Sequence, residues 1–213
     1  LPGTSINFKT GTWRVQKPRH HHEVAPCHHD CPAGEDAQAY LAHVQAGHNQ
    51  LAWETIVKVN PLPAITGRVC PHPCEAVCNR GQYDEPIAIH AVERFLGDEA
   101  IANNWPYPVN PVDKSAPEIA IVGAGPAGIS TAYHLVRLGY RAVIFDDHPE
   151  AGGTLRMALP PYRLPRSVLD AELGRVLALD GITFKPHTRL GRDMRLNELQ
   201  QQYPAVFLGL GAQ

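Results

Sequence analysis

Hydrophobic residues recur with a helical period in the first half of the chain. In residues 35–47 they are spaced three or four positions apart, acidic residues precede them, and Gly47 predicts a stop. Residues 49–61 repeat this pattern as far as Pro61, and residues 86–104 give a third helix of the same kind. Short helices joined by proline- and glycine-rich loops predict a small all-α domain.

The period changes at Glu118. Residues 118–123 form a continuous β-rich apolar run, residues 126–139 are helical up to Gly139, and residues 140–146 form a second apolar run. Later segments of the same two kinds are a helix at 166–181 and strands at 182–186 and 205–211. This strand–helix–strand order predicts an α/β, Rossmann-like domain with a doubly wound, parallel sheet.

A proline-rich stretch separates the two patterns. Four prolines fall within residues 103–117, which is typical of an extended linker. We therefore expect four segments, which are an N-terminal extension (1–24), an α-helical domain (25–104), a linker (105–117) and the N-terminal part of a dinucleotide-binding domain (118–213).

Composition narrows the classes of function. The chain has 213 residues and a net charge of -2, which gives no electrostatic reason to expect nucleic acid or an anionic membrane as a partner. It has neither an apolar run of about 18 residues nor the apolar core of a signal peptide. We expect a cytoplasmic protein without membrane insertion, and a reducing compartment disfavours disulfides among its five cysteines.

A glycine motif follows the first predicted strand. In "IVGAGPAG", Gly123 suits a tight turn, Gly125 lets the backbone approach a pyrophosphate, and Gly128 allows close packing of helix on strand. The pyrophosphate would sit at the N-terminus of the following helix, where free N–H groups favour anions. The residues that we expect to contact it are Gly123, Gly125, Pro126, Ala127 and Gly128.

A second group of residues indicates which dinucleotide binds. Asp146 ends the next strand and favours a ribose without a 2′-phosphate, hence FAD or NAD rather than NADP. The glycine pair in "EAGGTLR" suits a loop close to a bulky cofactor, which favours a flavin, although an ordinary type II turn would look similar. Small residues after the last strand would lie at the ligand-binding edge of the sheet. The candidates in this group are Asp146, Gly152, Gly153, Leu155, Arg156 and Gly211.

The cysteines suggest a metal. They are Cys27, Cys31, Cys70, Cys74 and Cys78. The last three could share one helix face, but Pro71 and Pro73 argue against a regular helix through them. Cysteine followed by proline is familiar at iron–sulfur clusters, whereas zinc usually shows closer pairs. Spacing favours an iron–sulfur site, and zinc or structural thiols remain open.

Several stretches together resemble a family, the glutamate synthase small-subunit-like flavoproteins. They are "CHHDCPAG", "NPLPAITGRVCPHPCEAVCNRG", "EPIAIHAVERFLGD", "IAIVGAGPAGIS", "AVIFDDHPEAGGTLR" and "PPYRLPRSVLDAEL". The group includes the N-terminal half of dihydropyrimidine dehydrogenase and the large subunit of the NADH-dependent ferredoxin:NADP oxidoreductase. The start of the chain also resembles the branch associated with dissimilatory sulfite reductase. The resemblance implies an α-helical domain with two [4Fe-4S] clusters, an FAD domain, and an NAD(P)H domain inserted into it.

The resemblance also implies ligands. Cys31, Cys70 and Cys74 match three thiolates of one cluster, and Glu93 stands where the family has a Gln or Glu ligand. Taken alone, "AVERF" predicts an ordinary amphipathic helix with Glu93 facing solvent, so its ligand role rests on the resemblance.

The second cluster lacks part of its family pattern. Cys27 and Cys78 match two of its ligands, but the family's two further cysteines precede Cys27 and are missing here. Their places fall near Arg19 and His22. Either this cluster is absent or a histidine, His22, completes it in altered form.

The chain ends at "VFLGLGAQ", which resembles the family's strand just before the NAD(P)H domain. We therefore expect a fragment of a longer chain, or a subunit whose partner supplies the rest. The resemblance implies an oxidoreductase that passes electrons between NAD(P)H, FAD, [4Fe-4S] and a redox partner protein. The alternatives are a cluster-bearing docking subunit without chemistry, a regulatory nucleotide module, or a zinc-stabilised helical domain on a Rossmann unit.

Overall fold

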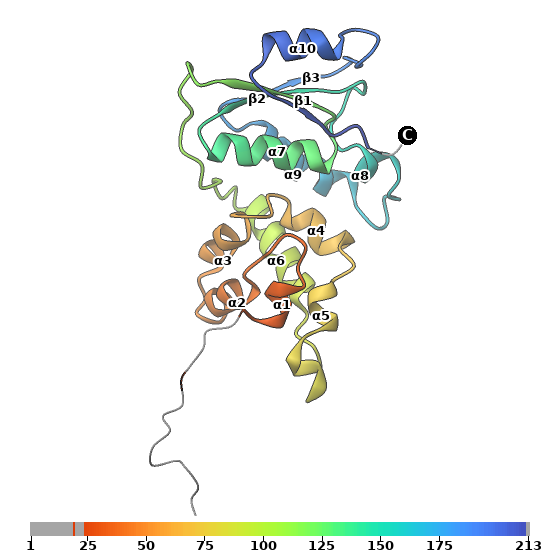
Figure 1. Ribbon diagram of the computed structural model, residues 1–213. Helices are drawn as coiled ribbons and strands as arrows, with labels where there is room; N and C mark the ends of the chain where they lie inside the picture. The colour runs from red at the N-terminus through yellow and green to blue at the C-terminus, as the bar shows by residue number, and fades with distance from the viewer. Residues whose placement is uncertain (1–18, 20–23, 212–213) are drawn as a thin grey trace, which may run out of the picture.

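A computed structural model describes residue 19 and residues 24–211, and these residues form a helical part and a sheet part (Figure 1). We call residues 24–104 the helical part and residues 118–211 the sheet part. The helices of the first are α1 (Pro26–His29), α2 (Ala37–Gln45), α3 (Asn49–Ile56), α4 (Pro63–Val69), α5 (Pro73–Ala76), the 3-10 turn η2 (Asn79–Gln82) and α6 (Ile89–Ala102). The elements of the second are β1 (Glu118–Val122), α7 (Pro126–Arg137), β2 (Arg141–Phe145), α8 (Thr154–Met157), α9 (Arg166–Leu177), β3 (Ile182–Lys185), α10 (Leu196–Gln202) and β4 (Val206–Leu208).

Two glycines bring α4 and α6 into close contact. A Cβ atom on Gly67 would lie 2.5 Å from the backbone nitrogen of Arg94, and one on Gly97 would lie 2.3 Å from that of Ala64. Only hydrogen side chains allow this approach, so each helix has a glycine where the other's backbone crosses it. The crossing fixes both the first turn and the later part of α4 against the middle of α6.

The sheet part contains a four-stranded parallel sheet with the order β3-β2-β1-β4. Alternate residues point to opposite faces, as the strand period of two requires. Ile121 and Ile144 pack on one face in the core that includes α7 and α9, whereas Val122 and Val143 pack on the other with Leu199 of α10. Figure 1 shows these two layers of helices on either side of the sheet, with α7 and α9 between the sheet and the helical part.

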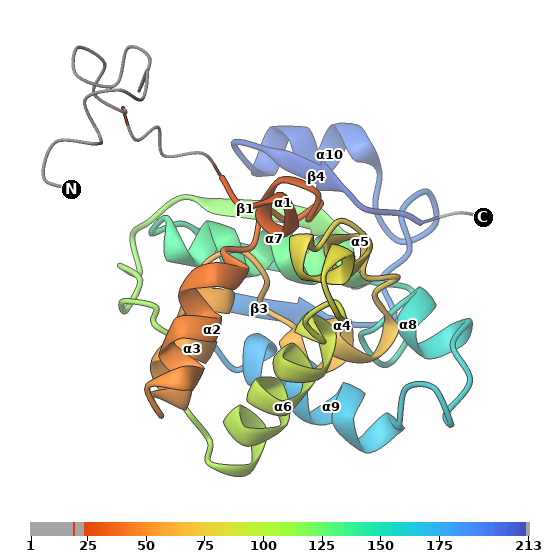
Figure 2. The same ribbon diagram turned by 90° about the horizontal axis from the view of Figure 1, so that it is seen from below.

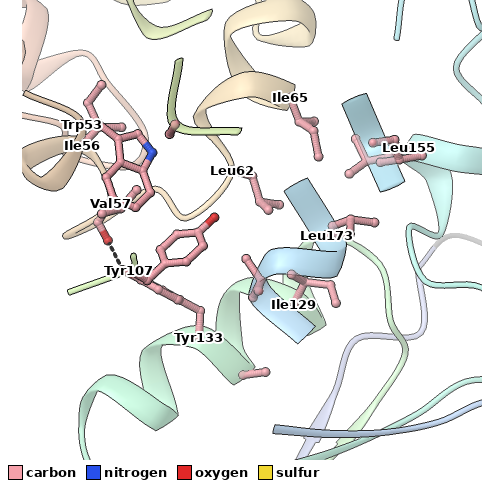
Figure 3. Close-up of a cluster of buried hydrophobic side chains, with 14 of the residues drawn as sticks. Trp53, Ile56, Val57, Leu62, Ile65, Tyr107, Ile129, Tyr133, Leu155 and Leu173 are labelled. Atoms are coloured by element: carbon pink, nitrogen blue, oxygen red, sulfur yellow. Dashed lines mark hydrogen bonds between the residues drawn. The ribbon is translucent and has the colours of Figure 1, made fainter. Parts of the chain in front are cut away.

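One hydrophobic core crosses from the helical part to the sheet part. Figure 3 shows Trp53 and Ile56 of α3 facing Tyr107, Tyr133 and Leu173. The hydroxyl of Tyr133 donates to the carbonyl of Val57 at 2.7 Å, and that of Tyr107 donates to the carbonyl of Pro61 at 2.8 Å. The two parts are therefore packed together, and the linker forms part of their contact.

The fold class predicted from the sequence is confirmed. The helices expected at 35–47, 49–61 and 86–104 correspond to α2, α3 and α6, and the parallel sheet is present. The sequence reasoning missed α4 and α10, and the shorter helices α1, α5 and α8. The proline argument is confirmed as well, because α4 ends before Cys70 and α5 begins only at Pro73. Within the described residues, no helix has the length and apolarity needed to cross a membrane.

Candidate cofactor sites

Three predicted cysteine ligands lie around the ends of short helices. Cys70 follows the last residue of α4 in extended conformation, and its Sγ accepts the backbone N–H of His72 at 3.4 Å. His72 adopts a left-handed conformation, φ 56°, which turns the chain so that Cys74 enters α5 with a buried side chain. Cys31 lies two residues after the end of α1, and α1 contacts α5. The Pro-His-Pro segment therefore forms a loop that separates Cys70 from Cys74, as expected from the prolines.

Glu93 does not face solvent, so the interpretation of its helix as ordinary and amphipathic was wrong at this position. Its residue is only 7% exposed, and it lies on the buried stripe of α6 together with Ile89, Leu96 and Ala100. The stripe runs through positions 89, 93, 96 and 100, so the helical period itself places the carboxyl inside. The sequence reasoning placed Glu93 at the surface because it is charged, and did not consider its position in the helical repeat.

A hydrogen-bond network surrounds this carboxyl. The hydroxyl of Tyr40 donates to Glu93 Oε1 at 3.2 Å, and Asn60 Nδ2 donates to Oε1 of the nearby Glu35 at 2.7 Å. Burial raises the pKa of both carboxyl groups, and the charge of Glu35 raises that of Glu93 further. Burial and the charge of Glu93 likewise raise the pKa of the Tyr40 hydroxyl. Sequence reasoning missed Glu35 and Tyr40, which contact the candidate ligand from α2 and the segment before it.

Electrostatic neighbours divide the cysteines into two groups. Burial raises the pKa of the Cys74 thiol to about 12, and the charges of Glu93, Cys31 and Cys70 add to this. Burial also raises the pKa of Cys70, with Glu93 and Cys31 again contributing. Cys31, Cys70, Cys74 and Glu93 are therefore neighbours, and this is the set that the resemblance implies for one cluster.

This set fits an iron–sulfur cluster in its chemistry. Glu93 and Cys31 raise the pKa of both Cys70 and Cys74, so that as anions these groups repel, and a positively charged iron centre would remove this repulsion. A single zinc ion with bonds of about 2.3 Å would hold its ligands within roughly 4 Å of one another. Among residues 19 and 24–211, no three His, Cys, Asp or Glu side chains are arranged so as to hold a single metal ion. The binding of an iron–sulfur cluster by this set stays a prediction.

The second predicted set is incomplete within the described residues. Burial raises the pKa of the Cys27 thiol most, and the charge of Cys78 raises it further. These two thiols therefore form a second pair of neighbours. The backbone N–H of Ile87 lowers the pKa of Cys78. Arg19 is exposed, and His22 lies outside the described residues, so its role stays a prediction. The division of Cys74 from Cys78 agrees with the two half-sites that the resemblance implies.

The glycine motif forms a tight cradle at the carboxyl ends of β1 and β4. Gly123 has φ 106°, and a Cβ atom there would lie 2.2 Å from the carbonyl oxygen of Gly209. A Cβ atom on Gly128 would lie 1.9 Å from the carbonyl oxygen of Gly123. The turn and the start of α7 are thus packed backbone to backbone. Gly209 was missed, although the "GLG" after the last strand was the available signal.

The loop carrying the glycine pair closes over this cradle. The backbone N–H of Gly152 donates to the carbonyl of Ala124 at 2.8 Å. A Cβ atom on Gly153 would lie 2.9 Å from Cα of Gly125, so the two glycine segments touch. Gly125 is the residue before α7, whose first residues Pro126 and Ala127 begin the helix. The predicted pyrophosphate position therefore lies at a helix N-terminus lined by backbone, which suits a dinucleotide.

Hydrogen bonds from two backbone N–H groups fix the side chain of Asp146. Its Oδ2 accepts the backbone N–H of Ala124 at 2.6 Å, and its Oδ1 accepts the backbone N–H of His148 at 2.9 Å. These bonds fix the carboxylate beside the glycine turn. The structure brings Asp146 to the predicted edge of the sheet, and its contact with a ribose stays a prediction.

The remaining candidates are differently placed. Leu155 is buried, and Arg156 donates to Asp170 at 2.5 Å and to the carbonyl of Ala151 at 2.8 Å. Arg156 thus ties the loop to α9. Gly211 is exposed with φ 74°, and nothing lies within 4 Å of a Cβ atom built there.

Comparison with known families assigns both parts. Residues 20–105 match the family described as dihydropyrimidine dehydrogenase domain II, 4Fe-4S cluster, and residues 121–165 match an NAD(P)-binding Rossmann-like domain. The first match covers all five cysteines and Glu93, and the second covers the glycine motif and Asp146.

Curated relatives match most of this chain. The beta subunit of an NADP(+)-dependent formate dehydrogenase of Moorella thermoacetica is 38% identical over 88% of this chain and 29% of its own length. The beta subunit of an NADPH-Fe(3+) oxidoreductase of Geobacter sulfurreducens is 37% identical over 93% of this chain and 30% of its own length. The small chain of an Escherichia coli glutamate synthase [NADPH] is 36% identical over 88% of this chain and 39% of its own length. The chain thus spans about a third of the length of these relatives.

Proposed function

We propose that this chain, which is similar to the glutamate synthase small chain and to related NADP(H)-dependent oxidoreductase subunits, carries electrons between FAD and a [4Fe-4S] cluster. The electrons come from NAD(P)H or go to it, and they are exchanged with a partner redox protein. The relatives' names mention NADP(+) or NADPH and call two of them subunits, which supports a nicotinamide donor and a larger complex. We propose a reducing, cytoplasmic location, in which the five cysteines form no disulfides with one another.

One observation carries the proposal. Three thiols and a carboxyl are neighbours in the helical part, with Cys74 and Glu93 buried and Cys31 and Cys70 half-buried, and a glycine-lined cradle lies in the sheet part packed against it. Mutually repelling donors and a backbone without side chains both favour occupation by a cofactor.

The chain's own residues hold and tune the cofactors. The N–H groups at the start of α7 would bind the pyrophosphate, Asp146 would fix the ribose, and Gly152 with Gly153 would admit the bulk of the cofactor. When bound, FAD exchanges a hydride with the nicotinamide and single electrons with a cluster. We prefer FAD to NAD(P) here because the loop with Gly152 and Gly153 packs against the glycine turn and would line a second side of the cofactor.

The cluster ligands would change protonation when they bind iron. Burial raises the pKa of Cys70 and Cys74, so iron bound by these two thiols would have to displace their protons. Tyr40 donates to Glu93 and would help to fix the position of that carboxyl. The N–H of His72 donates to the sulfur of Cys70 and would favour a more reduced cluster.

Anaerobic purification followed by an absorption spectrum and by iron and flavin analysis tests the proposal. We expect a yellow-brown protein with one flavin and either about four or about eight iron atoms per chain. Cys74→Ala should abolish the cluster that the first set binds. Cys78→Ala is the matched control, which keeps about four iron atoms. A colourless protein that contains zinc, or one that binds ADP but no flavin, would contradict the proposal.

A second possible function can be distinguished from the first by experiment. The chain could serve as a docking subunit whose cluster only relays electrons. Full occupation by iron with no flavin, in a protein that accepts electrons from a reduced ferredoxin-like donor, would favour that role.

A further inference from the structure

Glu172 belongs to neither candidate cofactor site, yet its side chain on α9 is completely buried. Its Oε1 accepts the backbone N–H of Ala64 and its Oε2 accepts that of Ile65, each at 2.8 Å. These two amides lie in the first turn of α4, where backbone N–H groups have no partner within the helix. One carboxyl group of the sheet part thus binds the start of a helix in the helical part.

Helix α4 transmits the position of its first turn to the cluster ligands. It begins at Pro63, ends at Val69 and is followed directly by Cys70. The Gly97–Ala64 contact locks the same turn against α6, which carries Glu93. A displacement of this turn would therefore move Cys70 and Glu93 together.

The other side of α9 contacts the loop that carries Gly152 and Gly153, which we call the flavin loop. Asp170 accepts Arg156 at 2.5 Å, and the side chain of Leu173 lies 3.5 Å from a Cβ atom built on Gly152. One turn beyond Glu172, Arg175 donates to the carbonyl of Trp105 and lies over the ring of Trp53. Figure 2 shows α9 beside both α4 and α8. A single helix thus contacts the dinucleotide loop, the linker and the start of α4.

We propose that Glu172 is a positioning residue that fixes the cluster ligands of the helical part relative to the flavin loop of the sheet part. The inference rests on the proposed function for its consequence in electron transfer. Its structural half, the restraint of α4 by α9, stands on the two hydrogen bonds and can be measured without cofactors.

The chemistry of the site requires a carboxyl group. Two backbone donors point at two oxygen atoms, so glutamine would direct its own NH₂ group at one of them and leave a buried N–H unsatisfied. Aspartate keeps both oxygens but is one methylene shorter, so it can recover the bonds only by drawing α4 and α9 together. Glu172→Gln and Glu172→Asp thus separate acceptor chemistry from reach.

Hydrogen exchange of the cofactor-free chain tests the restraint. In Glu172→Gln, the amides of Ala64 and Ile65 should exchange roughly 10-fold faster than in wild type, as expected for a lost buried hydrogen bond. The thiol of Cys70 should also react faster with an alkylating reagent. Glu85→Gln is the matched control, because Glu85 is exposed in the helical part. Unchanged exchange at both amides in Glu172→Gln would overturn the proposal.

Electron transfer in the loaded protein tests the consequence. After rapid reduction of the flavin, we expect roughly 10-fold slower reduction of the cluster in Glu172→Gln, with both midpoint potentials as in wild type. Partial recovery is expected for Glu172→Asp, which also serves if Glu172→Gln does not fold. Wild-type transfer rates despite faster exchange would overturn the positioning role alone. A wild-type protein with neither flavin nor iron would instead overturn the proposed function.

Discussion

Replacement of Gly97 by alanine tests the close crossing of α4 and α6. The new Cβ atom would lie 2.3 Å from the nitrogen and 2.5 Å from Cα of Ala64, so the helices must separate by about 1 Å to restore ordinary contact. Overpacking of this kind costs about 1–3 kcal/mol. Alanine recovers about 0.5–1 kcal/mol through its better helix propensity. We therefore expect a net loss of about 1–2 kcal/mol in the free energy of unfolding.

Gly174 provides a matched control on α9. It also lies inside a helix, but nothing is found within 4 Å of a Cβ atom built there. Gly174→Ala should stabilise the protein by about 0.5–1 kcal/mol, so the two variants should differ in sign. Urea unfolding followed by circular dichroism measures both. If Gly97→Ala is as stable as wild type while Gly174→Ala behaves as expected, the crossing is not tight and the reasoning fails.

Three further changes follow from the sites. Tyr40→Phe keeps the packing but removes the donor to Glu93, so it should lower stability by about 1–2 kcal/mol and alter the EPR signal of the bound cluster; an unchanged spectrum would separate Tyr40 from the site. Burial raises the pKa of Glu172 to about 8, although its two N–H bonds and the charges of nearby arginines lower it. Between about pH 4.5 and 8 the carboxyl therefore keeps its proton in the folded state and loses it in the unfolded state. The stability of wild type should therefore fall relative to Glu172→Gln between about pH 5 and 8, by roughly 1 kcal/mol per pH unit, and parallel pH profiles of the two would contradict this. Gly153→Ala places a Cβ atom 2.9 Å from Cα of Gly125 and should weaken flavin binding roughly 10-fold in fluorescence titrations, whereas undiminished affinity would remove the loop from the site.

The sequence predicted the elements whose signal is local. The helices α2, α3 and α6 and the strands β1 and β2 have long, regular hydrophobic periods, and the structure confirms them. Helix α4 was missed because seven residues containing a glycine carry little helical propensity of their own. Its first turn is stabilised by Glu172, more than a hundred positions away in the chain, and its middle by contact with α6. No window of sequence contains these causes.

The same distinction holds for the sites. Glycine spacing located the cradle because Gly123, Gly125 and Gly128 act within one turn, whereas Gly209 reaches it only through the pairing of β1 with β4. Glu93 was placed at the surface because it is charged. Its burial becomes visible only when the stripe through Ile89 and Leu96 is followed through it.

Buried carboxyl groups differ in how the fold compensates them, and this difference separates structure from function. Glu172 faces two backbone N–H donors, so its partners are already in place and the fold accounts for it. Glu35 and Glu93 instead face each other, and Glu93 also raises the pKa of Cys70 and Cys74. An assembly of potential anions in a buried place is unfavourable unless protons or a cation neutralise it. Protons would neutralise these acids and thiols one by one, whereas iron would bind the thiols and the carboxyl together and relieve their repulsion. We therefore propose that iron occupies this arrangement and that Glu172 helps to fix its position.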